Sequence, residues 1–215
     1  MDDQRQYQQK MGSLEDALAL LRSNDVIACA AVVNEPTDFL KALPSVLPGL
    51  NNITLFKGKE NYYDYLADLT YQKNIHTVSY LFGDNTRAAQ KVGMASYIPT
   101  DLSTLGANRT AVAPNNVFVA QVTEMDENGC FQLSYCEMFE KQMLECAETI
   151  ILEVNPQFRR VRGGLDIHIS HSHKVPHAAA PGILHGPGPL SCQHPAPLLR
   201  LAVSAVPAGD GEAQA

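Results

Sequence analysis

Four of the seven histidines lie close together, at His168, His171, His173 and His177. Imidazole nitrogens at such short spacings can bind a transition metal such as zinc. The composition of the chain also changes in this stretch, so the cluster could instead mark the point where one kind of sequence ends and another begins. The spacing of the histidines alone leaves both interpretations open.

The cysteines are a second source of reactive side chains, at Cys29, Cys130, Cys136, Cys146 and Cys192. Their number is odd and no CxxC pair occurs, so we expect no disulfide and infer a reducing, cytoplasmic environment. A nucleophilic cysteine needs a histidine or a helix N-terminus beside it. His76 is the only histidine before His168. We therefore expect structural cysteines, with Cys29 buried in an apolar run.

Two charged residues follow predicted strands and could contact a ligand. Glu35 could act as a nucleophile, but we favour the interpretation that it begins a helix, where a carboxylate stabilises the N-terminus. Arg87 could bind a phosphate or carboxylate, although a structural ion pair is the favoured alternative. Asp126 and Gly129, in the sequence DENG, are interpreted as residues that form a turn.

Strands and helices must position these residues, and the sequence alternates between patterns typical of buried strands and patterns typical of helices. Apolar runs rich in β-branched residues predict buried strands, at residues 25–33, 52–58, 75–83, 116–125 and 149–155. Helical spacing separates them, at residues 14–22, 36–43, 60–70, 84–93 and 137–147. Ser13 and Asp16 resemble a capping box before the first helix. Residues 130–135 are expected to be extended.

Strands that alternate with helices predict an α/β fold with an open, mainly parallel, doubly wound sheet. Ligands of such sheets bind beyond the carboxyl ends of the strands. The loops to inspect are residues 30–36, 82–87 and 122–130. The loops at residues 30–36 and 82–87 supply four candidate substrate-binding residues: Ala31, Asn34, Glu35 and Arg87.

Charge and hydropathy exclude several classes of protein. The formal net charge is −7, which argues against nucleic-acid binding because phosphate contacts need clustered Lys and Arg. The longest apolar run, Val26 to Val33, is far too short to span a bilayer. The first ten residues have no apolar stretch, so they are not expected to be a secretory signal.

A domain boundary is predicted near residue 174. Seven of the thirteen prolines lie between Pro176 and Pro207, and no aromatic residue follows Lys174. Such a segment buries too little apolar surface to offset its ordering entropy. We therefore expect one domain over residues 1–174 and a disordered tail over residues 175–215. Our hypothesis is that residues from about 171 onward are a non-native tail, which arises from a shifted reading frame or from a wrongly assigned gene end.

Five stretches, in this order, resemble the N-terminal domain of the acetyl-CoA hydrolase/transferase family, which includes butyryl-CoA:acetate and 4-hydroxybutyrate CoA-transferases. They are YQQKMGSLEDALALLRSNDVI, NEPTDFLKAL, GDNTRAAQKVGMASYIPTDLS, VAQVTEMDENGCFQLSY and CAETIILEVNPQFRRVRGGLDIHIS. The resemblance covers roughly residues 5–170. It implies a sheet of the CoA-transferase type, and it makes His168 an ordinary strand residue. We therefore expect no metal at the histidine cluster.

The resemblance also implies an activity and a missing part. In that family a glutamate of a second domain attacks an acyl-CoA thioester, and CoA is then passed through a glutamyl-CoA thioester to a second carboxylate. That domain is not in this chain, so the resemblance implies the N-terminal half of a CoA-transferase or acyl-CoA hydrolase, truncated before the catalytic glutamate and inactive alone. It would use coenzyme A as the acyl-CoA substrate, with a short-chain carboxylate such as acetate, and bind no cofactor.

The sequence leaves an alternative function open. The chain could be a non-catalytic subunit or binding module that pairs with a separate chain carrying the glutamate.

The first loop differs from the family pattern. Family members often have glycine shortly before the Glu-Pro of this loop, where this chain has Val32 and Val33, which make the loop narrower and stiffer. Without its partner domain, the chain is expected to expose apolar surface and to self-associate.

Overall fold

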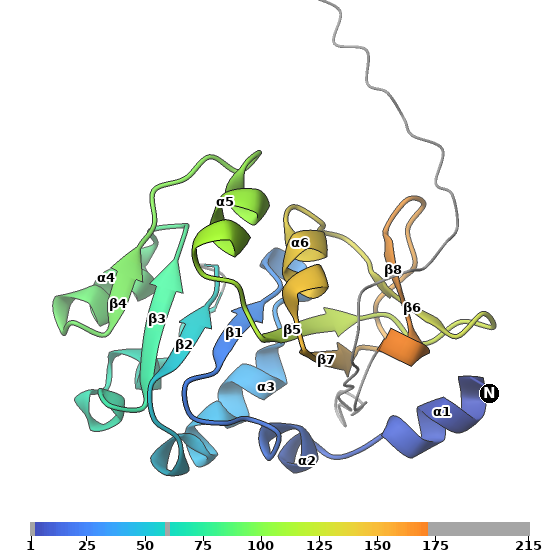
Figure 1. Cartoon of the computed structure of the whole chain (residues 1–215), viewed down its shortest axis with the longest axis horizontal. Coiled ribbons are helices and arrows are strands. Elements are labelled where there is room, and N and C mark those ends of the chain that lie inside the picture. The colour runs from blue at the N-terminus through green and yellow to red at the C-terminus, as the bar shows by residue number, and fades with distance from the viewer. Residues whose placement is uncertain (1–2, 59–60, 172–215) are drawn as a thin grey trace, which may run out of the picture.

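The computed structural model describes residues 3–58 and 61–171. Its centre is a six-stranded sheet in which every neighbouring pair of strands is parallel, in the order β4-β3-β2-β1-β5-β7 (Figure 1). The strands are β1 (Val26–Cys29), β2 (Ile53–Phe56), β3 (Ile75–Ser79), β4 (Ala95–Tyr97), β5 (Val117–Val122) and β7 (Thr149–Val154). The predicted α/β fold with an open parallel sheet is confirmed.

The order of the strands places a topological switch point between β1 and β5. The chain builds the sheet outward from β1 through β2 and β3 to β4, and then returns to lay β5 against the other side of β1. The connections after β1 and after β5 therefore leave the sheet side by side and in opposite directions. Ligands of doubly wound sheets bind at this position.

Helices cover both faces of the sheet, because the strand residues alternate between two apolar clusters. One face carries Ala28 and Phe118 and packs against α5 (Leu105–Val112) and α6 (Glu140–Cys146), which lie on the near side of the sheet in Figure 1. The other face carries Ile27 and Val119 and packs against α2 (Leu14–Leu18) and α3 (Thr37–Ala42). Strand residues in this setting are buried on both sides, as the apolar runs predicted.

The ends of two helices follow local features of the sequence. Ser13 caps α2, and its hydroxyl oxygen accepts a hydrogen bond from the backbone of Asp16, whose carboxylate accepts one from the backbone of Ser13. This is the capping box that the sequence resembled, although α2 ends earlier than predicted. Gly93 follows α4 (Asp84–Lys91) with φ +79, a conformation that glycine adopts without strain.

The predicted helix over residues 60–70 is wrong. The structure has two short 3-10 helices there, η4 (Asp64–Ala67) and η5 (Leu69–Tyr71). Tyr63 and Tyr65 are both buried, although residues two apart point to opposite sides of an α-helix. Burial of both rings therefore favours a tighter, broken path over one continuous α-helix.

The segment after β5 leaves the main sheet. Residues 130–135 were expected to be extended, and β6 (Cys130–Leu133) lies among them, but it pairs antiparallel with β8 (Leu165–His168) in a separate two-stranded sheet. At the other end of the chain, α1 (Asp3–Lys10) lies against the short 3-10 helix η6 (Ile169–His171). The sequence patterns predicted neither this small sheet nor α1, β4 and α5.

No helix among residues 3–58 and 61–171 has the length and apolar character needed to cross a membrane. The predicted tail over residues 175–215 lies outside the described residues, as do the last three residues of the predicted domain.

Candidate functional site

The loop that joins β1 to α3 is the centre of the candidate site. It begins at the switch point and contains three of the four residues proposed from the sequence, Ala31, Asn34 and Glu35, all of which are buried. Val32 and Val33 are the exposed part of this loop, with 44% and 46% of their surface open to solvent. The loop therefore presents two apolar side chains outward and turns its polar groups inward.

The backbone of this loop is strained at one residue. Val32 has φ +56, in the left-handed region that is costly for residues with a Cβ and most costly for β-branched ones. The short 3-10 turn η1 (Val32–Asn34) begins at this residue. Strained backbone of this kind is found where the surrounding structure holds it in place, and often at ligand sites.

Glu140 fixes the start of the loop. Its carboxylate is fully buried, and Oε1 accepts a hydrogen bond of 3.1 Å from the backbone N–H of Ala31. Oε2 accepts two more, from the backbone of Met138 at 2.7 Å and of Phe139 at 3.0 Å. One side chain thus ties the beginning of α6 to the loop after β1.

Glu153 fixes the end of the loop. This residue of β7 accepts hydrogen bonds from the backbone N–H groups of Phe39, at 3.0 Å, and Asp38, at 3.4 Å, in the first turn of α3. It also accepts a short hydrogen bond from the side chain of Gln121. Burial raises the pKa of Glu153 to about 7, although these hydrogen bonds favour the charged form. The carboxylate that accepts hydrogen bonds from the backbone at the start of α3 is therefore Glu153, and not Glu35 as the sequence suggested.

Glu35 instead forms a buried ion pair with Lys57, which directly follows β2. Lys57 Nζ lies 3.3 Å from Glu35 Oε2, and both side chains are almost fully buried. Glu35 Oε1 accepts hydrogen bonds from the hydroxyl of Tyr63 at 2.8 Å and from Asn61 Nδ2 at 3.0 Å. The ammonium group also donates to the carbonyl oxygens of Gly58 and Asn61. Hydrogen bonds thus surround Lys57 Nζ and Glu35 Oε1, while Glu35 Oε2 has only the ammonium group beside it.

Tyr63 is a donor in this cluster, not an anion. Burial raises its pKa, and the nearby carboxylate of Glu35 raises it further. The phenol therefore keeps its proton at neutral pH and can donate it to Glu35 in a hydrogen bond. Lys57 also lies over the ring of Tyr63, 5.4 Å from its centre. The cluster therefore joins the ends of β1 and β2 through one carboxylate, one ammonium and one hydroxyl group.

Asn34 connects the loop to the neighbouring strand. Its Nδ2 donates a hydrogen bond of 2.9 Å to the backbone carbonyl of Gln121 in β5. Its Oδ1 is buried and accepts no hydrogen bond from the residues that the structure describes. This amide oxygen is an acceptor at the switch point itself.

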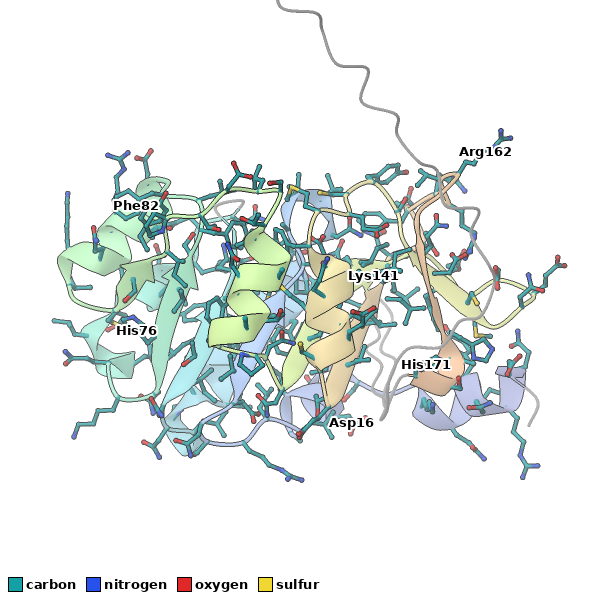
Figure 2. All side chains as sticks on the ribbon, turned by 45° about the horizontal axis from the view of Figure 1, so that its top comes forward. Asp16, His76, Phe82, Lys141, Arg162 and His171 are labelled. Carbon is teal, nitrogen blue, oxygen red and sulfur yellow. The ribbon has the colours of Figure 1, made fainter. Side chains whose placement is uncertain are left out.

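Arg87 does not join these residues. It lies on α4, after β3, and β2 separates that strand from β1. Its side chain is 60% exposed, its Nε is 3.9 Å from Asp84, and its guanidinium lies 5.2 Å from the centre of the Phe82 ring. Figure 2 places Phe82 at the side of the molecule formed by β3 and β4. The ion pair that the sequence favoured is present.

The other sequence candidates form local structure. Asp126 accepts hydrogen bonds from the backbone of Asn128 and Cys130, and Gly129 has φ +73, so both form the turn as predicted. Cys29 is buried, also as predicted. The ring of His76 pairs with Ser96 Oγ at 2.8 Å.

The histidine cluster is only partly within the described residues. His168 ends β8, and its ring pairs with Ser170 Oγ at 2.8 Å, so it is the strand residue that was expected. His171 lies beside α1, at the opposite side of the molecule from His76 (Figure 2). His173 and His177 lie outside the described residues. Within residues 3–58 and 61–171, no three His, Cys, Asp or Glu side chains are placed to hold a metal ion.

Sequence reasoning missed Lys57, Tyr63, Glu140 and Glu153, which hold the site together. The sequence contained an indication of two of them, a charged residue beside or within an apolar strand. Lys57 directly follows a buried apolar strand, and Glu153 is the one charged residue within the apolar run of β7. A charged residue in such a run is either paired or functional, because an unpaired charge there is very costly. Their partners could not be read from the sequence, since they lie on elements distant in the chain, such as the loop after β1 and the first turn of α3.

Comparison with known proteins relates this geometry to a family. Residues 1–180 match the family described as the acetyl-CoA hydrolase/transferase N-terminal domain. This match extends past residue 170, where the resemblance quoted from the sequence ends, and includes the four clustered histidines.

Two characterised relatives carry CoA-transferase names. The chain is 28% identical over 214 residues to the butyryl-CoA:acetate CoA-transferase of Anaerostipes caccae, which covers 97% of this chain and 48% of that protein. It is 25% identical over 184 residues to the 4-hydroxybutyrate coenzyme A transferase of Clostridium kluyveri, covering 81% of this chain and 41% of that protein. The chain spans less than half the length of these relatives.

Solved structures share the fold. RipA from Yersinia pestis superimposes with a TM-score of 0.70 at 23% identity, over 79% of this chain and 42% of that one. The 4-hydroxybutyrate CoA-transferase of Porphyromonas gingivalis superimposes with a TM-score of 0.57 at 23% identity, over 78% of this chain and 38% of that one. The expected sheet of the CoA-transferase type is therefore confirmed.

Proposed function

This chain belongs to the acetyl-CoA hydrolase/transferase family, and we propose that it is the N-terminal half of a CoA-transferase. The complete enzyme would move CoA from an acyl-CoA to a short-chain carboxylate such as acetate. The observation that carries the proposal is the family match over residues 1–180. The names of the two relatives support transfer between a CoA thioester and a carboxylate.

The proposal requires a catalytic carboxylate from outside these 215 residues. The relatives are more than twice as long as the part that this chain matches, which leaves room for a second domain, in the same or a separate chain. Glu35 is the described carboxylate nearest the exposed valines in sequence, but it is 1% exposed and is held by Lys57 and Tyr63. Attack on a thioester would require it to leave these partners, so we assign it a positioning role.

The loop after β1 is the part of this domain that would meet the acyl-CoA. Glu140 fixes its start and Glu35 is anchored near its end, so the exposed side chains of Val32 and Val33 have a defined position between two anchors. Apolar side chains at that position would contact the acyl chain, while the charged groups beneath keep the loop rigid. Rigid placement of substrate contributes to catalysis by reducing the entropy lost in reaching the transition state.

The test is a transfer assay on the chain alone and on a fusion. Transfer of CoA from butyryl-CoA to acetate is measured for the 215-residue chain and for the same chain fused to the second half of the Anaerostipes caccae relative. We expect no transfer by the chain alone and measurable transfer by the fusion. Activity recovered by mixing the two halves as separate chains would identify a two-subunit arrangement.

Two results would contradict the proposal. Transfer by the chain alone that is lost on Glu35→Gln, but kept on the matched exposed change Glu15→Gln, would make Glu35 the nucleophile. A fusion that is folded and still shows neither CoA transfer nor acyl-CoA hydrolysis would remove the CoA-transferase assignment.

A further inference from the structure

The buried carboxylate of Glu153 faces three hydrogen-bond donors. Two are the backbone N–H groups of Asp38 and Phe39, at 3.4 Å and 3.0 Å, and the third is the side-chain amide of Gln121. Glu153 is fully buried, so bulk water does not reach it. Three donors suit the charged form of this residue, because a carboxylate can only accept hydrogen bonds.

The protonated form of Glu153 needs a different set of partners. A neutral carboxyl group carries an O–H that must donate, and the three groups that face it all donate as well. A backbone N–H cannot become an acceptor. An amide side chain can, because its oxygen and nitrogen exchange places when the group rotates by half a turn. Gln121 is therefore the partner that can adapt to the proton.

The surroundings of Glu153 favour its neutral form. Burial, and to a smaller degree the carboxylate of Asp38, raise the pKa of Glu153 to about 7, although its hydrogen bonds lower it. Asp38 pairs with Lys41, and Glu35 in the loop before α3 pairs with Lys57. Within residues 3–58 and 61–171, no cationic side chain forms an ion pair with Glu153. Both forms of Glu153 are therefore populated near neutral pH.

Rotation of the Gln121 amide affects two neighbouring side chains. Its Nε2 lies 2.9 Å from Thr37 Oγ1, and a hydroxyl group can donate or accept, so Thr37 fits both orientations. Its Oε1 accepts a hydrogen bond of 3.2 Å from Asn155 Nδ2. After rotation, Gln121 would present Nε2 to Asn155, so that two N–H donors would face each other. Asn155 must then rotate as well.

Asn155 connects this network to the surface. Its Oδ1 accepts a hydrogen bond of 2.9 Å from the backbone N–H of Gln157, an exposed residue of the loop after β7. Rotation of Asn155 turns this oxygen towards Gln121 and leaves the N–H of Gln157 to water. A continuous series of hydrogen bonds therefore runs from the first turn of α3 through β7 and β5 to this loop.

We propose that Glu153 is the sensor of a proton-driven switch, in which its protonation rotates the side-chain amides of Gln121 and Asn155 and releases the backbone N–H of Gln157. The turn keeps its backbone hydrogen bond of 3.0 Å from Phe158 to Asn155, so it loosens without unfolding. The loop after β7 leaves the sheet at its carboxyl edge, where ligands of this class of fold bind. The switch therefore makes the order of that edge depend on pH.

This switch does not rest on CoA transfer. All of its hydrogen bonds lie within one domain, so it can be measured in the chain without an acyl-CoA or a second domain. The transfer assay tests the proposed function, whereas a titration without substrate tests the switch. Either can fail while the other holds.

The experiment is an NMR titration of the isotope-labelled 215-residue chain between about pH 5 and about pH 9. We expect the side-chain amide signals of Gln121 and Asn155 and the backbone amide signal of Gln157 to shift together, with one midpoint at about pH 7. Below this midpoint the hydrogen-exchange protection of Gln157, corrected for the intrinsic pH dependence of exchange, should fall roughly two- to tenfold, as the loss of one hydrogen bond predicts.

Two variants separate the switch from the titration of a single residue. Glu153→Gln introduces an amide that carries a donor at every pH, so it should hold the low-pH arrangement and remove all three shifts. Asn155→Ala removes the connection to the loop, so Gln121 should still titrate while Gln157 shows no pH-dependent step. The matched control is Glu148→Gln, an exposed change that should leave the titration as in the parent.

Three results would overturn the inference. They are side-chain signals of Gln121 and Asn155 that do not change with pH, midpoints that differ among the three residues, and a pH-dependent step at Gln157 that persists in Asn155→Ala. The side chain of Asn155 is only half-buried, so this variant decides the question even if Glu153→Gln does not fold.

Discussion

The buried pair of Glu35 and Lys57 illustrates how a single residue can be misread from the sequence. A glutamate before Pro36 at a predicted helix start suggests a charge that stabilises the helix dipole. In the structure its carboxylate is enclosed with Lys57, Tyr63 and Asn61, so its energetic role depends on all of them. Removing one member of such a pair leaves the other charge buried without a partner.

Breaking this pair should destabilise the protein strongly. We expect Lys57→Met to lower the free energy of unfolding by about 3–5 kcal/mol, because it strands the buried carboxylate of Glu35. The matched control is Lys41→Met, which breaks the exposed pair with Asp38 and should cost at most about 1 kcal/mol. Urea denaturation followed by circular dichroism measures both. Equal costs would show that the buried pair contributes no more than a surface pair.

Glu153 makes the free energy of unfolding depend on pH. Burial raises the pKa of Glu153 to about 7 from its ordinary value of 4.5. Between these values the folded protein holds a proton that the unfolded chain releases, so this group makes the free energy of unfolding fall as pH rises through that window and level off above it. At low pH, where both states are protonated, the group contributes nothing.

The variant Glu153→Gln should remove this dependence. From about pH 4.5 to about pH 7.5, we expect the parent to lose on the order of a few kcal/mol of stability relative to Glu153→Gln. Chemical denaturation at a series of pH values measures the difference, with the exposed Glu148→Gln as the matched control. A constant difference across the series would show that Glu153 does not titrate in this range.

At the scale of elements, the loop after β1 is a strained segment with buried glutamates on three sides. Glu140 comes from α6, Glu153 from β7, and Glu35 from the loop itself. Each carboxylate accepts hydrogen bonds that a helix, a strand or a side chain offers at a fixed position. They anchor the chain on both sides of Val32, which has φ +56, a conformation that is costly for valine.

Replacing this valine should reveal the strain. The left-handed conformation costs a residue with a Cβ about 1–2 kcal/mol, which exceeds the roughly 0.5–1 kcal/mol entropic cost of glycine. We therefore expect Val32→Gly to leave the melting temperature unchanged or to raise it slightly. Val33→Gly is the control, because Val33 is equally exposed but has no positive φ, and it should lower the melting temperature. Equal decreases in both variants would show that Val32 is not strained.

At the scale of the whole molecule, exposed apolar side chains follow two strands at the carboxyl edge of the sheet. Val32 and Val33 follow β1, while Ile98 and Leu102 follow β4, and all four are exposed. Large exposed apolar patches mark surfaces that bind another protein. The surface is where a second domain or a second copy of the chain would be expected to pack.

We expect the isolated chain to self-associate through this surface. Sedimentation velocity over a range of concentrations should show oligomers, and Val33→Asp or Ile98→Asp should shift the distribution towards the monomer. Leu69→Asp is the control, because Leu69 is also exposed but precedes β3, away from the carboxyl edge. A chain that stays monomeric at every concentration would contradict the prediction.

The sequence alone determined the layers of the fold. Apolar β-branched runs such as residues 25–33 and 149–155 are typical of strands buried on both faces, as in a parallel sheet covered by helices. Local signals were equally readable, such as the capping box at Ser13 and the glycines that end α4 and form the DENG turn. In each case the information lies within a few consecutive residues, where spacing and backbone preference act directly.

Only the tertiary structure decided which of these elements meet. Glu35 and Lys57 are twenty-two positions apart, Glu140 and Ala31 more than a hundred, and no local pattern relates them. The same holds for Arg109 of α5, whose guanidinium stacks on the ring of Phe56 in β2. Burial of a charge depends on which strands are neighbours, and strand order follows from the packing of the whole chain. The sequence thus predicted the edge of the sheet at which to look, while the packing selected the residues that form the site.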